Sequence, residues 1–371
     1  MATEIYLSPD DSRPRRVLIV RVGAMGDVLH ALPAAAALRE LHPDWYIGWA
    51  IEPRWLPLLK ADSSVSEPLA RGAAMPLVDK TYFAATRAWK QRPFSWTTLR
   101  EISSLRRELR GERFDLCVDM QGSIRSAVIG RMAGAKRFAG PAKPHEGPAR
   151  WLYGERVRET ATHIVEQGCE LLGGAAGEVL KPAKVLLPVD AVAEKFCDEL
   201  LARTVPEGGD FVVIAPTAGW GAKEWPAERY GQVAAELSRA GYRVLVNVAA
   251  ASDPSGEAVV RASGGSAVTA PTSLAELIAL VRRAKLVIAG DTGPLHLAAA
   301  LEIPVVGLFG PTDPARNGPY GTRSRVLRHA TSQRDHSRHQ ETEQGLMQIT
   351  ADEVIEAAFE LLRAEKGKVE E

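Results

Sequence analysis

The sequence predicts an α/β protein with two domains, each built on a parallel sheet that helices cover on both faces. Apolar runs such as 17–20, 211–215 and 286–289 are each followed by a glycine-containing turn and a helical pattern. Strands that are apolar at every position are typical of sheets buried on both faces. The alternation starts again after a glycine-rich segment near 173–188, which indicates a domain boundary. We expect an amino-terminal domain at 1–180 and a carboxy-terminal domain at 181–371.

The composition is that of a globular protein with a substantial core. The chain is 46% apolar and 25% charged, and its formal net charge is zero, so bulk electrostatics give no sign of a nucleic-acid partner. The three cysteines are far apart and lack metal-ligand spacing. Residues 1–16 lack the apolar core of a signal peptide, and no stretch approaches the ~20 apolar residues of a membrane span. We expect a cytoplasmic protein whose contact with a membrane is peripheral.

The first domain begins with a strand, a glycine turn and a helix. The apolar strand 15–21 runs into Gly23 to Asp27 and then into an alanine-rich helix. Further strands are expected at 45–51 and 114–118, and the turn at 119–122 leads into a helix at 123–132. Because ligands bind at the carboxyl edges of open parallel sheets, both turns are candidate binding positions.

A basic segment lies between these strands. Residues 86–96 are predicted to be irregular. In the helix predicted at 99–113, apolar residues recur at helical spacing, namely Leu99, Ile102, Leu105 and Leu109. The other face carries arginines at 100, 106, 107 and 110. This basic face is either an ordinary solvated surface or a surface that attracts an anionic acceptor or membrane.

The second domain repeats the pattern. Strands are expected at 211–215, 242–248, 267–270, 286–289 and 304–309, with helices at 191–201, 226–240 and 273–283. Thr350 and Glu353 form a capping-box pattern that opens a terminal helix at 351–364. Packing of this helix back onto the amino-terminal domain is one option.

The turn Asp291-Thr292-Gly293 has the pattern of a phosphate site, because the unsatisfied N–H groups at the start of a helix attract anions. Neither glycine turn matches the dinucleotide motif G-x-G-x-x-G, and no Asp-x-Asp pair follows a strand. His336 and His339 have no neighbours that complete a ligand set. We therefore expect no metal and no cofactor, so that Lys223 and the helix start neutralise a bound diphosphate.

Four motifs in one order give a specific resemblance. Residues 17–33, 119–122, 221–226 and 290–314 together resemble the ADP-heptose:lipopolysaccharide heptosyltransferases, glycosyltransferase family 9, over roughly 15–365. Residues 119–127 and 162–166 are most similar to heptosyltransferase I, which acts on the Kdo sugar of the inner core. The resemblance implies a GT-B fold, two Rossmann-like domains that face each other across a cleft, and inverting transfer of heptose.

The resemblance also implies roles for individual residues. Asp27 matches the catalytic base, although an aspartate at a helix start is also an ordinary cap. Lys223 matches the phosphate-binding lysine, and His296 is either a ligand contact or a packed core residue. The other expected donor-binding residues are Thr217, Gly219, Gly221, Asp291, Thr292 and Gly293. The expected acceptor-binding residues are Arg87, Lys90 and Arg92, in an acceptor loop at 86–96, together with Arg125 and Arg137.

The expected partners are ADP-heptose, an anionic lipopolysaccharide core acceptor and the cytoplasmic face of the inner membrane, with no nucleic acid. Several alternatives fit the same motifs. They are a heptosyltransferase for a later core position or for a protein acceptor, a GT-B sugar-nucleotide epimerase, and a non-catalytic protein that binds nucleotide sugars.

Overall fold

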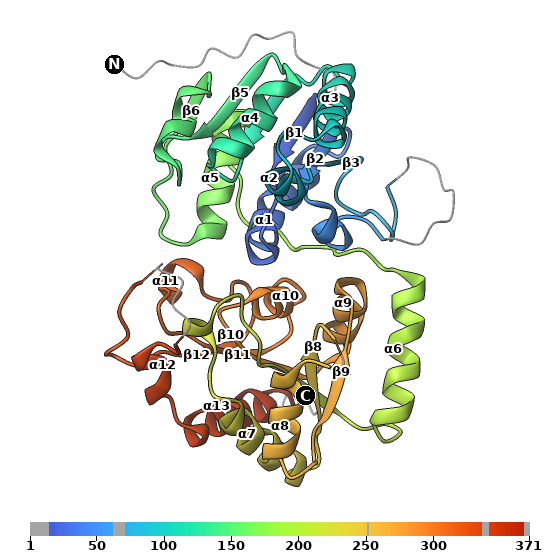
Figure 1. Cartoon of the computed structure of the whole chain (residues 1–371), viewed down its shortest axis with the longest axis vertical. Helices are drawn as coiled ribbons and strands as arrows, with labels where there is room; N and C mark the ends of the chain where they lie inside the picture. The colour runs from blue at the N-terminus through green and yellow to red at the C-terminus, as the bar shows by residue number, and fades with distance from the viewer. Residues whose placement is uncertain (1–14, 62–70, 251, 336–340, 367–371) are drawn as a thin grey trace. The chain divides into compact units, whose positions relative to one another are not determined.

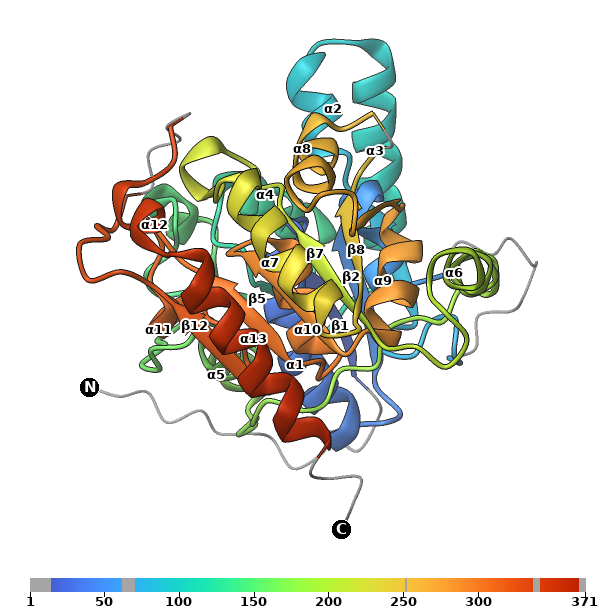
Figure 2. The same cartoon turned by 90° about the horizontal axis from the view of Figure 1, so that it is seen from below.

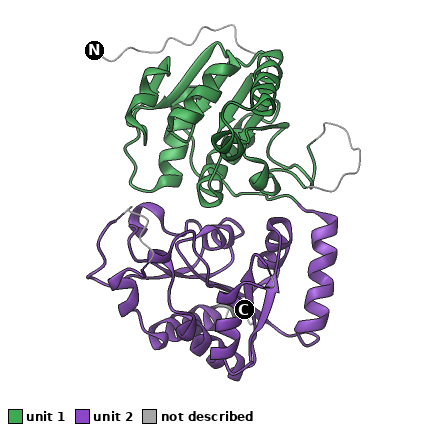
Figure 3. Cartoon of the chain, in the orientation of Figure 1, with its two compact units in different colours: residues 1–188 green, residues 189–371 purple. Residues whose placement is uncertain are grey.

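A computed structural model describes residues 15–61, 71–250, 252–335 and 341–366. The chain divides into two compact units, unit 1 up to Pro188 and unit 2 from Val189 onward (Figure 3). Among the described residues each unit contains one six-stranded sheet (Figure 1). Every pairing between neighbouring strands is parallel. The predicted fold of parallel sheets with helical connections is therefore confirmed.

The sheet of unit 1 has the strand order β3-β2-β1-β4-β5-β6. Its strands are β1 (Arg16–Val20), β2 (Tyr46–Ile51), β3 (Lys80–Phe83), β4 (Leu116–Asp119), β5 (Arg137–Pro141) and β6 (Glu155–Val157). Its helices are α1 (Met25–Leu41), η1 (Pro53–Leu58), α2 (Thr86–Gln91), α3 (Trp96–Gly111), α4 (Ile124–Ala133), η2 (Gly147–Trp151) and α5 (Ile164–Ala176). Helix α1 packs against α5, and α3 packs against α4.

The sheet of unit 2 has the order β12-β11-β10-β7-β8-β9. Its strands are β7 (Phe211–Ala215), β8 (Arg243–Val248), β9 (Val268–Pro271), β10 (Leu286–Gly290), β11 (Val305–Leu308) and β12 (Ser324–Leu327). Its helices are α6 (Ala191–Thr204), η3 (Gly221–Lys223), α7 (Ala227–Arg239), α8 (Pro254–Ala262), α9 (Leu274–Arg283), α10 (Gly293–Ala300), α11 (Pro314–Asn317), α12 (Gln344–Gln348) and α13 (Ala351–Lys366).

Both sheets have the same winding, and it determines where each unit can bind a ligand. In each sheet the first strand lies beside the fourth, β1 beside β4 and β7 beside β10. From these two neighbouring strands the chain continues toward opposite edges of the sheet, so the strand order reverses between them. Ligands of doubly wound sheets bind in the crevice at this switch point. The turns after β1, β4, β7 and β10 are those that carry the predicted motifs.

The central strands are apolar because helices cover both of their faces. All residues of β7 and β10 are buried, as are Val17 to Val20 in β1. The terminal helix α13 packs on α7 and on β10, β11 and β12, with Val354 and Ala358 fully buried. The predicted capping box opens it, since Thr350 N–H donates to Glu353 Oε2 at 2.7 Å. Docking of α13 onto the amino-terminal domain stays a prediction.

Two expectations for the basic segment were wrong. Residues 86–91 form α2 rather than an irregular loop, because Glu52, directly after β2, caps this helix from a distant part of the chain. Its Oε1 accepts hydrogen bonds from the backbone N–H of Arg87 at 2.7 Å and from Thr86 Oγ1 at 3.1 Å. In α3, Leu99 is 48% exposed, so the buried face consists of Thr98, Leu105 and Leu109.

Candidate active site

A buried arginine organises the first turn. Arg21 follows β1, and its Nη2 lies 2.8 Å from Asp27 Oδ1 while its Nε donates to the Asp27 carbonyl at 3.2 Å. Its Nη1 donates to the carbonyl of Met120, in the turn after β4. The second carboxylate oxygen of Asp27 accepts from the N–H of Ala24 at 2.9 Å. Asp27 is therefore fixed in orientation, yet its side chain is 49% exposed, so it can meet a ligand.

Asp119 holds the neighbouring turn together. Its carboxylate is fully buried and accepts hydrogen bonds from Gln121 N–H at 2.9 Å, Ser126 Oγ at 2.9 Å and Tyr153 OH at 2.7 Å. Burial raises the pKa of the Asp119 carboxyl, and these hydrogen bonds oppose the rise. The side-chain oxygen of Gln121 accepts from Val22 N–H at 2.9 Å. This bond joins the turns after β1 and β4.

Trp55 lies directly against Gly23. A β-carbon at Gly23 would come within 2.5 Å of Trp55 Nε1, and the φ angle of Gly23 is +157°. Only glycine fits this position without displacing the indole. The indole N–H of Trp55 is buried and has no hydrogen-bond partner among the described residues. No spacing in the sequence signals this contact, because η1 reaches the turn only in the folded chain.

In unit 2, side chains from three neighbouring strand ends meet at Asp291. Lys223 Nζ, in the segment after β7, lies 2.6 Å from Asp291 Oδ2. His296 Nε2, on α10, lies 2.9 Å from Asp291 Oδ1, and Thr312 Oγ1, after β11, donates to Oδ2 at 2.7 Å. Burial alone raises the pKa of the Asp291 carboxyl, but His296 and the Lys223 ammonium outweigh it and hold the pKa well below its usual range.

This network fixes the positions of several predicted donor-site residues. His296 is buried and its ring contacts Asp291, as a packed core residue would, and its contact with a ligand stays a prediction. Asp291 does not cap α10, and the N-cap residue Thr292 uses its hydroxyl to donate to the Gly290 carbonyl at 3.2 Å. Lys223 retains 16% side-chain exposure, so its ammonium is held at the turn and still borders solvent.

The remaining donor-site residues lie on the same two segments. Thr217 is half-buried and Gly219 is exposed in the loop after β7, and Gly221 begins η3. Gly293 begins α10 directly after the Asp291 turn. The sequence reasoning missed Trp220, whose ring centroid lies 5.5 Å from Lys223 Nζ. It also missed Thr312, although this residue lies within the motif at 290–314.

The structure brings together some of the expected acceptor residues. Arg87 and Lys90 are exposed on α2, and Arg92 is the residue that ends it. Arg125, at the start of α4, contacts α2: its Nη1 lies 3.4 Å from the hydroxyl oxygen of the first residue of α2. Arg137 lies apart from them, at the amino end of β5.

Arg137 is already engaged by a carboxylate. Its Nε and Nη2 donate to the two oxygens of Glu155 at 2.7 and 2.6 Å. The described residues contain no group of three or more His, Cys, Asp or Glu side chains placed to hold a metal ion. His336 and His339 lie outside the described residues.

Two doubly wound units, each with motif-bearing turns at its switch point, define a protein of the GT-B class. The profile of glycosyltransferase family 9 (heptosyltransferase) matches residues 102–347. The chain belongs to this family, and it is therefore a glycosyltransferase.

Relatives and a solved structure agree with this assignment. The chain is 28% identical over 320 residues to lipopolysaccharide heptosyltransferase 1 of Escherichia coli (strain K12), covering 84% of this chain and 93% of that protein. It is 29% identical over 325 residues to lipopolysaccharide heptosyltransferase 1 of Pseudomonas aeruginosa, covering 84% and 82%. The structure of E. coli heptosyltransferase WaaC with ADP matches with a TM-score of 0.73 at 26% identity, over 93% of this chain and 99% of that one.

Proposed function

We propose that this protein transfers heptose from ADP-heptose to the Kdo region of the lipopolysaccharide inner core, with inversion and without a metal ion. Two of its relatives are lipopolysaccharide heptosyltransferases 1, and a structural neighbour was solved with ADP. The observation that carries the proposal is Asp27, a half-exposed carboxylate that Arg21 holds at the switch point of unit 1. A general base needs this combination of fixed orientation and access to substrate.

In the proposed reaction Asp27 takes the proton of the acceptor hydroxyl as the oxygen attacks the anomeric carbon of heptose. The bond from that carbon to the diphosphate oxygen breaks on the opposite face, and ADP leaves with the electron pair. Arg21 keeps the carboxylate in one position through the reaction, so little reorganisation is needed when the acceptor arrives.

Lys223 is proposed to bind the departing diphosphate. Asp291 holds its ammonium in place, with His296 and Thr312 fixing Asp291 in turn. Thr217, the backbone N–H groups of Gly219 and Gly221, and the start of α10 at Thr292 and Gly293 supply further donors. Together these groups offer a cation and helix-start N–H groups to the negative charge that develops on ADP.

The acceptor is proposed to bind beside α2. Arg87, Lys90, Arg92 and Arg125 supply cations for an anionic sugar, and Arg125 already contacts α2. Arginine presents a fork that matches a carboxylate such as that of Kdo. We leave Arg137 out of this set, since Glu155 occupies its guanidinium.

Because the proposed acceptor is lipid-linked, we propose that the enzyme works at the cytoplasmic face of the inner membrane. No helix in the described ranges has the length and apolar character needed to cross a bilayer. The contact proposed here is therefore peripheral.

The test is transfer by wild type and Asp27→Asn in a matrix of nucleotide sugars and acceptors that includes ADP-heptose with Kdo-lipid A. Asparagine can still accept the Ala24 N–H but leaves the Arg21 guanidinium without its counter-charge, so the variant should lose some stability and stay folded. Its rate should fall on the order of 10²–10⁴-fold. Asp44→Asn, which removes an exposed carboxylate just after α1, is the matched control and should keep the wild-type rate.

Several outcomes would contradict the proposal. A folded Asp27→Asn variant with more than about a tenth of the wild-type rate would exclude the base role. Turnover of the nucleotide sugar without acceptor would favour an epimerase. Transfer only to a later core sugar or to a protein would replace the proposed acceptor.

A further inference from the structure

The outer surface of α3 and the turn before it carry unusually exposed aromatic side chains. Phe94 is 92% exposed and Trp96 is 86% exposed, and Leu99, one turn further along, is 48% exposed. Soluble proteins seldom leave neighbouring large apolar side chains this open unless the surface binds something. Figure 2 shows α2 and α3 side by side as a helical hairpin at the edge of unit 1, and the indole of Trp89 donates to Glu101 at 2.8 Å between them.

The same surface is basic. Trp96, Arg100 and Arg107 follow one another at spacings of four and seven residues, which puts them on one stripe of the helix. This stripe lies opposite the buried residues Leu105 and Leu109. Arg100 and Arg107 are exposed and form no ion pair with any described residue.

The two acidic residues of α3 do not offset this charge on the outer surface. Glu108 lies 3.0 Å from Lys80 Nζ, and Glu101 accepts from the Trp89 indole. Both carboxylates therefore face the β3 and α2 side of the helix. The outer stripe presents only aromatic, apolar, small polar and cationic side chains.

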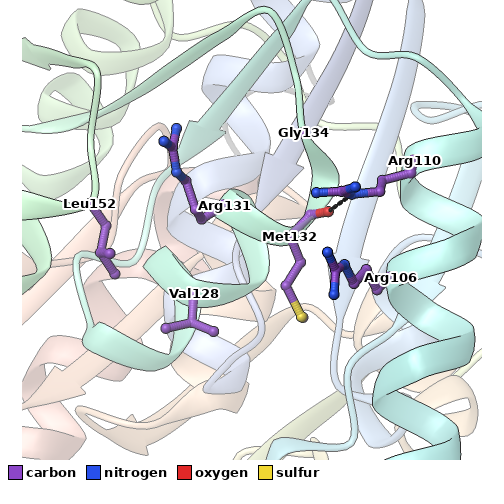
Figure 4. A pocket seen from close by; sticks show the side chains of 7 residues that line it. All are labelled: Arg106, Arg110, Val128, Arg131, Met132, Gly134 and Leu152. Carbon is purple, nitrogen blue, oxygen red and sulfur yellow. Dashed lines mark hydrogen bonds between the residues drawn. The ribbon is translucent and has the colours of Figure 1, made fainter.

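A basic groove continues the surface toward α4. Arg106 and Arg110 from α3 and Arg131 from α4 border a hollow of about 500 Å³ above Val128 and Met132 (Figure 4). Arg110 Nε donates to the Met132 carbonyl at 3.3 Å, which orients its guanidinium at this hollow. Cations above an apolar floor suit an anionic group attached to an apolar chain.

We propose that the α3 surface, defined as Phe94, Trp96, Leu99, Arg100 and Arg107, docks the enzyme on a bilayer containing anionic phospholipid. The helix lies in the plane of the interface, the aromatic rings enter the headgroup region, and the arginines bind phosphates. The adjoining groove takes a phospholipid headgroup. This inference rests on the proposed function in assuming a lipid-linked acceptor.

Charge selects the bilayer over a second copy of the chain. Two α3 surfaces brought together would place unpaired arginines against each other, which opposes association. An anionic headgroup layer offers the complementary charge and a boundary where tryptophan and phenylalanine are stable.

The test is sedimentation of the full chain with vesicles of phosphatidylglycerol and phosphatidylcholine, compared with phosphatidylcholine alone. Wild type should bind the anionic vesicles, and binding should weaken as salt screens the arginines. Arg100→Gln/Arg107→Gln should weaken binding by about fivefold for each arginine. Phe94→Ser/Trp96→Ser should weaken it on the order of tenfold or more.

Matched controls come from the exposed surface of α6. Val192, which is 70% exposed, is replaced in Val192→Ser, and two cations are removed in Lys195→Gln/Arg203→Gln. These variants should bind vesicles as wild type does. All variants change exposed side chains, so their thermal unfolding should match that of wild type.

The proposal is overturned if wild type ignores anionic vesicles, or if the α3 variants bind them as tightly as the controls. Transfer to a water-soluble Kdo acceptor separates this result from the proposed function. The α3 variants should keep that activity, because none of the changed residues is assigned to the site. Failure of wild type to use any Kdo acceptor would count against the proposed function. The vesicle binding of the α3 variants would still test the docking surface independently.

Discussion

Replacing Asp291 by asparagine should destabilise unit 2 far more than an ordinary surface change. The carboxylate has 7% side-chain exposure and contacts Lys223, whose exposure is 16%. Asparagine keeps the shape but leaves the lysine, held beside the turn, without its counter-charge. Removing one partner of a buried ion pair costs about 3–5 kcal/mol, and we expect a loss of free energy of unfolding toward the lower end of that range because Lys223 still borders solvent.

A double-mutant cycle isolates the interaction. Lys223→Met removes the ammonium while keeping the stem, and the Asp291→Asn/Lys223→Met pair should recover about 1–3 kcal/mol of the summed single losses. The matched control is the exposed pair of Lys285 and Asp210, whose side chains are 42% and 44% exposed at 3.6 Å. Its cycle should give a coupling of only about 0–1 kcal/mol.

The assay is urea unfolding read by amide hydrogen exchange in peptides that cover β7 and β10, which follows unit 2 separately. Because the folded pKa of Asp291 is depressed, its stabilisation is fully present above the unfolded carboxyl pKa of about 3.9 and is lost as pH falls through the folded value. The difference between wild type and Asp291→Asn should therefore shrink below about pH 4. Additive single losses, or a difference that stays constant down to pH 3, would refute the reasoning.

Three further predictions concern unit 1. Arg21→Met should lower the transfer rate by roughly 10–100-fold although Asp27 remains, because a misplaced base loses alignment with the substrate. Steady-state kinetics measures this, and an unchanged rate would exclude a positioning role for Arg21. Gly23→Ala should cost about 1–3 kcal/mol of unfolding free energy through its clash with Trp55, and chemical unfolding should show part of that loss restored by adding Trp55→Ala. Glu52→Ala removes the cap of α2, so amide exchange in α2 should speed up by about fivefold or more while α4 stays unchanged; equal protection in both proteins would contradict the long-range cap.

Much of the fold follows from local pattern, and three of the strands that the sequence did not predict share one cause. The central strands β1, β7 and β10 are covered on both faces, so they are continuous apolar runs that predict strands directly from the sequence. The strands β3, β6 and β12 lie at sheet edges and mix polar with apolar residues over three or four positions. Such short mixed segments carry little periodic signal. Helix α2 has no side-chain cap from its own segment. Its cap comes from Glu52, far away in the sequence, so the local pattern could not predict this helix.

The site shows a similar division. The turns at Asp27 and Asp291 were predicted because each follows an apolar run and opens a helix. The pairing of Lys223 with Asp291 could not be predicted, because it depends on how two loops at adjacent strands fold toward each other. Trp55 against Gly23 is likewise a contact between separate segments.

The pairing of Lys223 with an internal carboxylate has a consequence for the end of the proposed catalytic cycle. The lysine is already neutralised by Asp291 before a nucleotide arrives, so a diphosphate must share the ammonium instead of gaining an unpaired one. In the proposed cycle, we expect that arrangement to lower the affinity for the spent nucleotide as well as for the donor. When ADP departs in that cycle, the Asp291 carboxylate pairs fully with the Lys223 ammonium again, so no unpaired charge is left. In the proposed function, this pairing therefore favours ready release of ADP and repeated turnover over tight retention of the product.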